Sequence, residues 1–279
     1  MSEIFIASFY KFVPLGDLIT LQESLLQCGK SNDILGTILL APEGINGTIA
    51  GLSGNIEAVF ECMRAEQSLL RDIQYKSSSS QKMPFKRLKV RIKREIVTFG
   101  EEQINPLEQV GTYVDAQDWN RLIEDPQVVL IDARNHYEVE IGTFKGAIDP
   151  QTESFGEFPQ YVRKNLDPQK HKKIAMFCTG GIRCEKASSF MLKQGFEQVY
   201  HLKGGILEYL RQIKAQESLW QGECFVFDDR VALKMGLKEG STKMCYSCGF
   251  PISAIEQNCK NCHLELEGNS DSIRDGKSA

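Results

Sequence analysis

The residues best suited to chemistry in this chain form the loop Cys178-Thr179-Gly180-Gly181-Ile182-Arg183-Cys184. This loop follows an apolar stretch, residues 174–177, that is predicted to be a buried strand, and it leads into a helix predicted over residues 183–194. A thiol at such a junction faces the free N–H groups and the positive dipole of the helix N-terminus. Both favour thiolate over thiol, so we expect Cys178 to have a depressed pKa and a nucleophilic or redox role.

The other residues of the loop are suited to holding a negative charge. Gly180 and Gly181 allow the backbone to curl so that several amide groups point at one anion, and Arg183 adds a fixed positive charge. A thiolate, a persulfide or a small oxyanion would be stabilised here. We therefore interpret Cys178 and Arg183 as catalytic and the residues between them as the anion cradle: Thr179, Gly180, Gly181 and Ile182.

Other interpretations of this loop exist. A cysteine-dependent phosphatase also binds an anion at a helix start, but its arginine comes one residue later, at the position that Cys184 occupies here. The shorter loop favours sulfur chemistry over phosphate chemistry. Cys184 is a candidate resolving thiol for Cys178, although a cysteine in a first helical turn more often packs inward. A buried structural cysteine before an ordinary glycine turn is the remaining alternative.

A second group of cysteines indicates metal binding. Cys245-x2-Cys248 and Cys259-x2-Cys262 have the paired spacing of a tetrahedral zinc site with four thiolate ligands. Four thiolates leave no open coordination position, so the predicted zinc is structural. His263 adjoins the last cysteine and is an alternative ligand.

The chain has nine cysteines, a number that would suggest disulfides only in an oxidising compartment. Their clustering favours metal binding and thiol chemistry over disulfides. Three cysteines stand alone in apolar or helical contexts and are predicted to be buried small hydrophobic residues: Cys28, Cys62 and Cys224.

Residues 82–94 are strongly basic in a chain whose net charge is −4. Within them, apolar Leu88, Val90 and Ile92 alternate with cations, which on a strand places a row of positive charges on one face. Alternate residues lie roughly 6–7 Å apart, similar to the phosphates of a nucleic acid. A basic stripe of this kind is typical of RNA-binding or DNA-binding surfaces. The predicted RNA-binding residues are Lys86, Arg87, Lys89, Arg91 and Lys93. The alternative is a solvated edge strand, in which lysines discourage aggregation.

These groups are positioned by two predicted domains and a C-terminal module. Residues 1–97 alternate strand and helix signals in the order βαββαβ, which predicts a ferredoxin-like (acylphosphatase-like) domain. Its expected strands are residues 4–10, 34–41, a strand beginning at 48, and 88–97, its helices are 17–28 and 55–69, and 43–47 form a turn. Residues 98–111 are a polar linker.

The second predicted domain spans residues 112–215 and repeats strand–helix units. Such an α/β pattern predicts a parallel sheet with helices on both faces. The expected strands are 128–131, 174–177 and 199–202, and the expected helices are 115–124, 158–165, 183–194 and 206–215. Residues 216–279, the cysteine-rich module with its polar tail, contain little core-forming sequence.

The composition is that of an ordinary globular protein, with 42% hydrophobic and 25% charged residues. No run approaches the roughly 20 apolar residues that span a bilayer. The apolar stretch 4–10 is flanked by Glu3 and Lys11, and no cleavage site of small residues follows it. We therefore expect a cytoplasmic protein without membrane contact.

The cysteine loop resembles the active-site loop of the rhodanese superfamily, whose pattern is Cys-x-x-Gly-x-Arg after a buried strand. Asp132-Ala133-Arg134, with Glu138, is similar to the rhodanese Asp-x-Arg segment, and Leu202-Lys203-Gly204-Gly205 resembles its late glycine turn. The histidine that is usual after Gly142 is Thr143 here. Asp132 and Arg134 are expected to brace the loop, with a purely structural role as the alternative.

Longer motifs extend the resemblance to the rhodanese-like, oxygen-dependent tRNA uridine(34) hydroxylases. It covers the chain to about His263. The matching motifs are Glu43-Gly44-Ile45-Asn46, Leu88-Lys89-Val90, Arg134-Asn135-His136-Tyr137-Glu138, the nine residues from Cys178 to Lys186, and Phe227-Asp228-Asp229-Arg230. Family members commonly carry a further cysteine pair, whereas residues 268–279 are polar and lack cysteine.

The resemblance implies an oxidoreductase that forms 5-hydroxyuridine at the wobble position of tRNA with molecular oxygen, through an essential Cys178 that works as a persulfide. The basic strand would hold the anticodon stem-loop, and a sulfur donor protein is a possible partner. The residues alone predict only sulfur chemistry. They show no flavin or nicotinamide fingerprint and no His/carboxylate set for iron, with only four histidines in the chain. The alternatives are a sulfurtransferase that delivers persulfide sulfur to tRNA or a carrier protein, and a non-catalytic RNA-binding protein.

Overall fold

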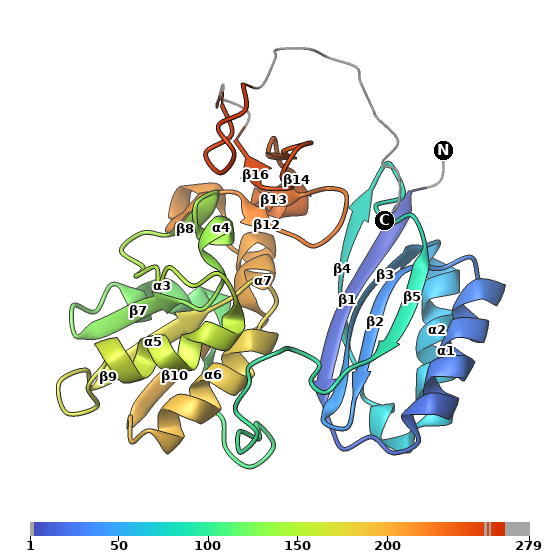
Figure 1. Ribbon diagram of the computed structural model, residues 1–279, viewed down its shortest axis with the longest axis horizontal. Helices are drawn as coiled ribbons and strands as arrows, with labels where there is room; N and C mark the ends of the chain where they lie inside the picture. Colours follow the sequence, from blue (N-terminus) through green and yellow to red (C-terminus); the bar gives the residue numbers. More distant parts are fainter. Residues whose placement is uncertain (1–2, 254–255, 257, 266–279) are drawn as a thin grey trace.

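A computed structural model of the chain describes residues 3–253, 256 and 258–265. The N-terminal sheet with its two helices stands beside a second α/β unit, and the C-terminal segment lies across one end of that unit (Figure 1). Within these ranges, no helix is long and apolar enough to cross a membrane. The polar tail predicted at residues 268–279 lies outside the described residues.

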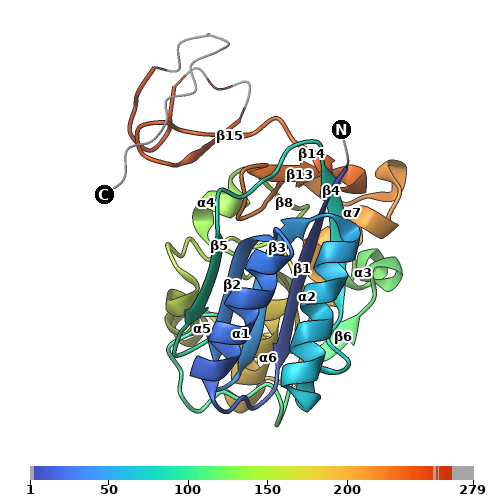
Figure 2. The ribbon, with the colours of Figure 1, turned by 90° about the vertical axis from the view of Figure 1, so that its right-hand side faces the viewer.

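The N-terminal unit is a sheet of five strands in the order β4-β1-β3-β2-β5. Its neighbours are antiparallel except for β2 and β5, which are parallel. Two helices cover one face of the sheet, which Figure 2 shows from the helix side. The elements are β1 (Ile4–Phe12), α1 (Leu18–Ser31), β2 (Leu35–Ala41), β3 (Gly44–Gly51), α2 (Ser53–Glu66), a 3-10 turn (Ser68–Leu70), β4 (Tyr75–Ser80) and β5 (Leu88–Ile92). The predicted ferredoxin-like, acylphosphatase-like fold is confirmed.

Two details of that prediction were wrong. The fourth strand of the fold is β4, whose serine-rich sequence carries no apolar alternation, and the basic stretch forms an additional edge strand, β5. Most of this edge strand is serine, so it shows no apolar periodicity, which is why the pattern did not reveal it. The turn expected over residues 43–47 is shorter, because β3 already begins at Gly44.

Cys28 and Cys62 form a disulfide between α1 and α2, with their Cα atoms 6.8 Å apart. The expectation that both are isolated hydrophobic residues was therefore wrong. The two helices pack side by side on the same sheet face, which brings cysteines 34 positions apart in the sequence into contact. Cys224, in contrast, is buried and unpaired as expected.

The second unit has a four-stranded parallel sheet in the order β6-β10-β9-β7, as predicted for the rhodanese domain. Along β9, Ile174 and Met176 pack into the core on one face while Ala175 and Phe177 pack into the core on the other. This two-sided burial explains the uninterrupted apolar run in this strand. The elements are β6 (Thr112–Val114), α3 (Ala116–Ile123), β7 (Val128–Asp132), α4 (His136–Val139), β8 (Gly142–Phe144), a 3-10 turn (Phe155–Glu157), α5 (Phe158–Asn165), β9 (Lys173–Phe177), α6 (Ile182–Lys193), β10 (Gln198–Leu202) and α7 (Gly205–Gln212).

The segment after α7 contributes to the core, contrary to expectation. Trp220, only 8% exposed, packs against Phe144, and its strand pairs with β8. The buried residues of this segment lie in strands of only two or three residues, which are too short to show a periodic pattern. The elements are 3-10 turns at Ala215–Glu217 and Met235–Leu237, and strands β11 (Trp220–Gly222), β12 (Cys224–Phe225), β13 (Ala232–Lys234), β14 (Lys238–Glu239), β15 (Lys243–Met244) and β16 (Pro251–Ile252).

A buried lysine joins the two units. Lys186 of α6, with 2% of its side chain exposed, places Nζ 2.8 Å from Glu43 Oε2 and 3.1 Å from Glu95 Oε1. Glu43 also accepts a hydrogen bond from the backbone N–H of Ile96 at 2.7 Å. The Glu43-Gly44-Ile45-Asn46 motif therefore ties the first unit to the connector and to the helix that starts at the cysteine loop.

We predict that Lys186→Met lowers the free energy of unfolding by about 2 kcal/mol, because two carboxylates lose their partner at a desolvated interface. The matched control is Lys170→Met, which removes an exposed ion pair with Asp167 and should cost less than about 1 kcal/mol. Urea unfolding followed by circular dichroism measures both. Equal losses for the two variants would contradict a structural role for the Lys186 contacts.

Candidate active site

Cys178 lies immediately after β9 and is fully buried, at the point where the chain turns into α6. Its Sγ accepts a hydrogen bond from the backbone N–H of Gly181 at 3.2 Å. Gly181 has a φ of 105°, a conformation that glycine adopts without strain. The strand, loop and helix expected from the sequence are therefore present, and the loop aims an amide at the sulfur.

A second glycine turn holds the backbone of the loop. The N–H groups of Ile206 and Leu207 donate to the carbonyl oxygens of Cys178 and Thr179 at 2.9 and 3.1 Å. At Gly205 the φ is 68°, and a Cβ there would lie 2.5 Å from the Cys178 oxygen. Only glycine allows this close approach, so the Gly204-Gly205 turn fixes the loop from the start of α7.

Arg183 is held by a buried carboxylate, Glu138, which belongs to two of the sequence motifs but to which the sequence assigned no role. Its guanidinium makes a bidentate ion pair with Glu138, with N–O distances of 2.6 and 2.8 Å, and donates to Thr179 Oγ1 at 3.1 Å. Glu138 in turn accepts from the Thr179 hydroxyl at 3.2 Å and from the backbone N–H of Asn135. Although burial opposes its charge, the Arg183 guanidinium holds the pKa of Glu138 below its usual value.

Asp132 and Arg134 form a second buried pair below the loop. Nε and Nη2 of Arg134 lie 2.9 and 2.6 Å from the Asp132 carboxylate. The same guanidinium donates to the carbonyl oxygens of Glu138 and Gly142, and Thr143 donates its hydroxyl to Asp132 at 2.8 Å. This pair thus ties the ends of β7, α4 and β8 together and reaches the loop through Glu138.

The electrostatics around Cys178 favour the thiolate. Burial alone would raise the pKa of Cys178, but a hydrogen bond from the Cys184 thiol, the charge of Arg183 and the amides of Cys184 and Gly181 outweigh it. Together they lower this pKa to about 5. Burial and the bond to Cys178 raise the pKa of Cys184 well above its ordinary value. Cys184 therefore lies close enough to Cys178 to influence its charge, while the resolving role of Cys184 stays a prediction.

The N-terminal unit completes the site with residues that the sequence did not indicate. Tyr10 of β1 donates its hydroxyl to Glu185 Oε1 at 2.8 Å, and Tyr113 donates to Glu185 Oε2 at 2.6 Å. Lys76 of β4 donates to the carbonyl oxygen of Gly180 and lies over the Tyr10 ring. No sequence signal marks Tyr10 or Lys76, whereas Glu185 belongs to the long motif around the loop.

A cavity of about 630 Å³ lies between the cysteine loop and the sheet face that α1 and α2 leave uncovered. Strands β1 to β4 of the N-terminal sheet contribute to its wall, Phe85 and Lys93 line it just before and after β5, and the loop contributes Cys178 and Arg183. The two sides of the cavity face each other across it. Residues of the first unit that line it include Tyr10, Thr37, Asn46 and Lys76, and those of the loop include Thr179 and Ile182. Cys178, although fully buried, is thus one of the lining residues of a cavity that both units build.

The predicted RNA-binding residues lie beside this cavity. In β5, Leu88 and Val90 pack into the core under α1, whereas Ile92 is 38% exposed because it ends an edge strand. Lys93 lines the cavity, and Arg91 is exposed on the edge strand. The other three cations line an adjoining groove of about 460 Å³, defined here as the basic groove: Lys86, Arg87 and Lys89.

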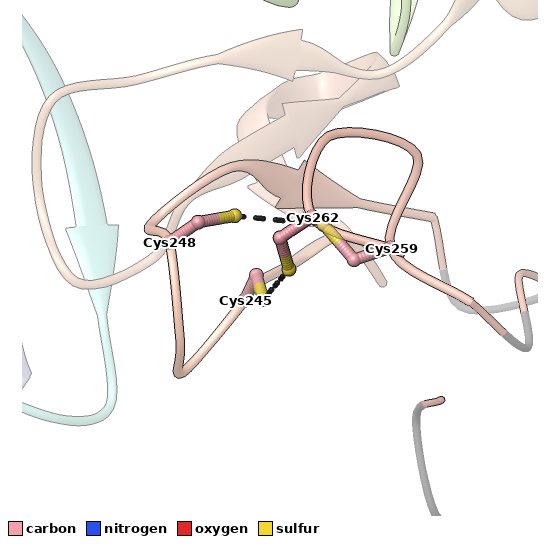
Figure 3. A group of neighbouring side chains, drawn as sticks. All are labelled: Cys245, Cys248, Cys259 and Cys262. Carbon is pink, nitrogen blue, oxygen red and sulfur yellow. Dashed lines mark hydrogen bonds between the residues drawn. The ribbon is translucent and has the colours of Figure 1, made fainter. Parts of the chain in front are cut away.

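The four cysteines of the C-terminal module converge on one point (Figure 3). Their sulfur atoms all lie within 4.8 Å of one another. The Cys245–Cys262 and Cys248–Cys259 sulfur distances are 3.7 and 3.6 Å. Metal–sulfur bonds of about 2.3 Å in a tetrahedron place sulfur atoms about 3.8 Å apart, so the cluster can bind a metal ion. His263 does not belong to this group.

Comparison with known proteins identifies the family of this chain. Residues 4–96 match the UPF0176 acylphosphatase-like domain, and residues 115–212 match the rhodanese-like domain. A tRNA uridine(34) hydroxylase from Picosynechococcus sp. is 55% identical over 257 residues, which cover 92% of this chain and 86% of that protein. This chain belongs to the tRNA uridine(34) hydroxylase family. The family expected from the motifs is thereby confirmed, and the chain is a homologue of an oxidoreductase.

Solved structures resemble parts of this hydroxylase-family chain only distantly. The rhodanese-like domain of an Anabaena protein is 20% identical and covers 40% of this chain and 80% of its own, with a TM-score of 0.32. An acylphosphatase from Coxiella burnetii is 13% identical and covers 32% of this chain and 93% of its own, with a TM-score of 0.24.

We predict that iodoacetamide alkylates Cys178 with a half-maximal rate near pH 5, since the depressed pKa keeps the thiolate populated at all higher pH values. Peptide mass spectrometry between pH 4 and 9 measures this rate. Cys224 is the internal control, because burial raises its pKa to about 12 and it should stay unmodified. A half-maximal rate for Cys178 near the ordinary cysteine value of 9.0 would contradict the thiolate assignment.

Proposed function

We propose that this chain hydroxylates carbon 5 of uridine 34 in tRNA, with molecular oxygen as co-substrate and Cys178 as the essential thiol. Besides family membership, the position of Cys178 in the wall of a cavity supports the proposal. The ionisable sulfur lines a cavity whose other wall is a sheet with a basic edge. Its volume of about 630 Å³ falls within the roughly 300–1,000 Å³ typical of small-molecule sites, which is room for one unstacked nucleotide.

In this proposal the residues of the loop have separate tasks. Cys178 acts as thiolate or persulfide, and the N–H groups of the loop stabilise its negative charge. Arg183 adds positive charge while Glu138 keeps its guanidinium in place. Cys184 holds a proton next to the sulfur and can act as a resolving thiol. A persulfide at Cys178 would require a sulfur donor protein as a further partner.

The substrate must present its uridine as an unpaired base, because a base held inside a stack cannot enter the cavity. The anticodon loop of tRNA meets this condition. The cations of the basic groove, with Lys93 and Arg91, would bind the phosphates on either side of that base. We also propose a cytoplasmic location, where tRNA is available.

Nucleoside analysis of cellular tRNA tests the proposal. In a strain lacking this gene, we expect 5-hydroxyuridine and its derivatives to disappear, since no other thiol of the chain lies in the cavity loop in ionised form. Mass spectrometry of digested tRNA should show recovery with the wild type but not with Cys178→Ser. Cys224→Ser changes a buried thiol outside the cavity and should restore the modification.

Two outcomes would count against hydroxylation. If a thiolated uridine disappears while 5-hydroxyuridine persists, the chain is a sulfurtransferase. If Cys178→Ser restores the modification as well as the wild type does, the loop is dispensable and the chain acts by binding RNA.

For the RNA-binding cations, we predict that the double variant Lys86→Glu/Lys89→Glu weakens binding of an anticodon stem-loop at least tenfold. The slope of the logarithm of the association constant against the logarithm of the salt concentration should also become less negative by roughly 1 to 2, because about two phosphate contacts are lost. Fluorescence anisotropy across a salt series measures both. Lys170→Glu/Lys172→Glu makes the same charge change at exposed sites outside the groove, and an equal effect there would contradict a specific role for the groove.

For the four-cysteine cluster, we propose zinc as the metal and a structural role, because four thiolates leave no position for a substrate. We predict about one zinc ion per chain by plasma mass spectrometry, lost in Cys259→Ser. Alkylation of Cys178 in that variant should keep its pH profile, since the cluster lies outside the cavity lining. A zinc content unaffected by this substitution would contradict the proposed site.

A further inference from the structure

Phe227 has a large apolar side chain that is exposed between the cavity and the basic groove. Its exposed fraction is 64%, and its ring lies at the junction between the cavity and the basic groove, both of which it lines. It opens the Phe227-Asp228-Asp229-Arg230 motif, to which the proposed function assigns no task.

The exposure of this ring is built into the structure. Arg230 pairs with Asp228 through N–O distances of 2.8 and 2.6 Å, and it donates to Ser78 of β4 at 2.8 Å. The N–H of Asp229 donates to the carbonyl oxygen of Pro84 at 3.0 Å. The motif is thus anchored to the N-terminal unit on two sides. Phe225 supports the Phe227 ring edge-on, with the ring centroids 5.2 Å apart.

The surroundings of Phe227 combine an aromatic neighbour with positive charge. Phe85, which is half-buried, lines the cavity and the groove together with it. Three cations line the groove, namely Lys86, Arg87 and Lys89. Of the two acids there, Asp228 is paired with Arg230, which leaves Asp229 as the one acid of the groove without an ion pair among the described residues. The groove is therefore net positive beside an aromatic rim.

We propose that Phe227, with Phe85, is a stacking subsite for the base of a nucleotide next to the uridine in the cavity. This inference rests on the proposed function and deepens it. Aromatic faces bind unstacked bases of any sequence, and an adjoining row of cations binds the phosphates of the same strand. Stacking outside the cavity holds the neighbouring base away from the target, so that only one base enters toward Cys178.

The charge of the groove favours RNA over a protein partner for this surface. A protein segment would need acidic side chains to match the cations and apolar ones to cover Phe227. A single strand of RNA supplies phosphates and flat bases in alternation, which is the pattern that the groove and the rim present. Unchanged RNA binding by a Phe227 variant would instead indicate a protein partner for this surface.

The test compares Phe227→Ala and Phe227→Trp on the full-length protein with an anticodon stem-loop RNA. We expect Phe227→Ala to weaken binding about tenfold, because the stacking surface is lost, and Phe227→Trp to stay within about twofold of the wild type. Ile19→Ala removes an apolar side chain of similar exposure, 65%, from α1 and should change nothing. Alkylation of Cys178 should be equal in all variants, which shows that the site is folded.

A second RNA, with an abasic nucleotide next to uridine 34, makes the test specific. The abasic RNA should bind the wild type about tenfold more weakly, and Phe227→Ala should then add little, because both changes remove the same contact. If Phe227→Ala binds the intact stem-loop as tightly as the wild type, the subsite is wrong and the ring faces another partner. If the wild type binds neither RNA, the proposed function itself fails.

Discussion

The buried ion pair between Arg183 and Glu138 is the interaction on which the rest of the site depends. A guanidinium without a partner would not be stable at this depth, because its desolvation costs several kcal/mol. With Glu138 as partner, a permanent positive charge can stay close to Cys178 at a buried position. The same carboxylate caps α4 and binds the Thr179 hydroxyl, so loop geometry and thiolate electrostatics share one origin. Changing either partner would alter both together.

The second constraint is that one domain alone does not make the site. The rhodanese loop supplies the sulfur, but the wall opposite it is the open face of the acylphosphatase-like sheet. Lys186 fixes this arrangement from the helix that starts at the loop, and Tyr10 and Lys76 reach the loop from β1 and β4. The added sheet turns a generic thiol loop into a cavity of defined size with a basic edge. This is a physical reason for a rhodanese domain to be joined to such a partner.

Features encoded by contiguous residues could be predicted from the sequence. The cysteine loop, the paired cysteines and both domain types depend on local spacing, and each is present. Features that join distant segments could not. Tyr10 and Glu185 are 175 positions apart, and the sequence around neither residue predicts their hydrogen bond. The Cys28–Cys62 disulfide likewise depends on which two helices are neighbours. The strand β4 was missed because a polar edge strand beside a cavity needs no apolar alternation.

The molecule uses one local device twice. Asp132-Ala133-Arg134 and Asp228-Asp229-Arg230 each place an arginine two residues after an aspartate, and both form the same bidentate pair with the same backbone contact. The first pair stiffens the base of the cysteine loop, and the second stiffens the rim that carries Phe227. In each turn the ion pair itself adds no net charge, and Asp229 of the second turn has no ion pair among the described residues. The positive potential along the path to Cys178 therefore comes from the basic strand and Lys76. The basic strand lies where it could bind phosphates, and Lys76 lies near the thiolate.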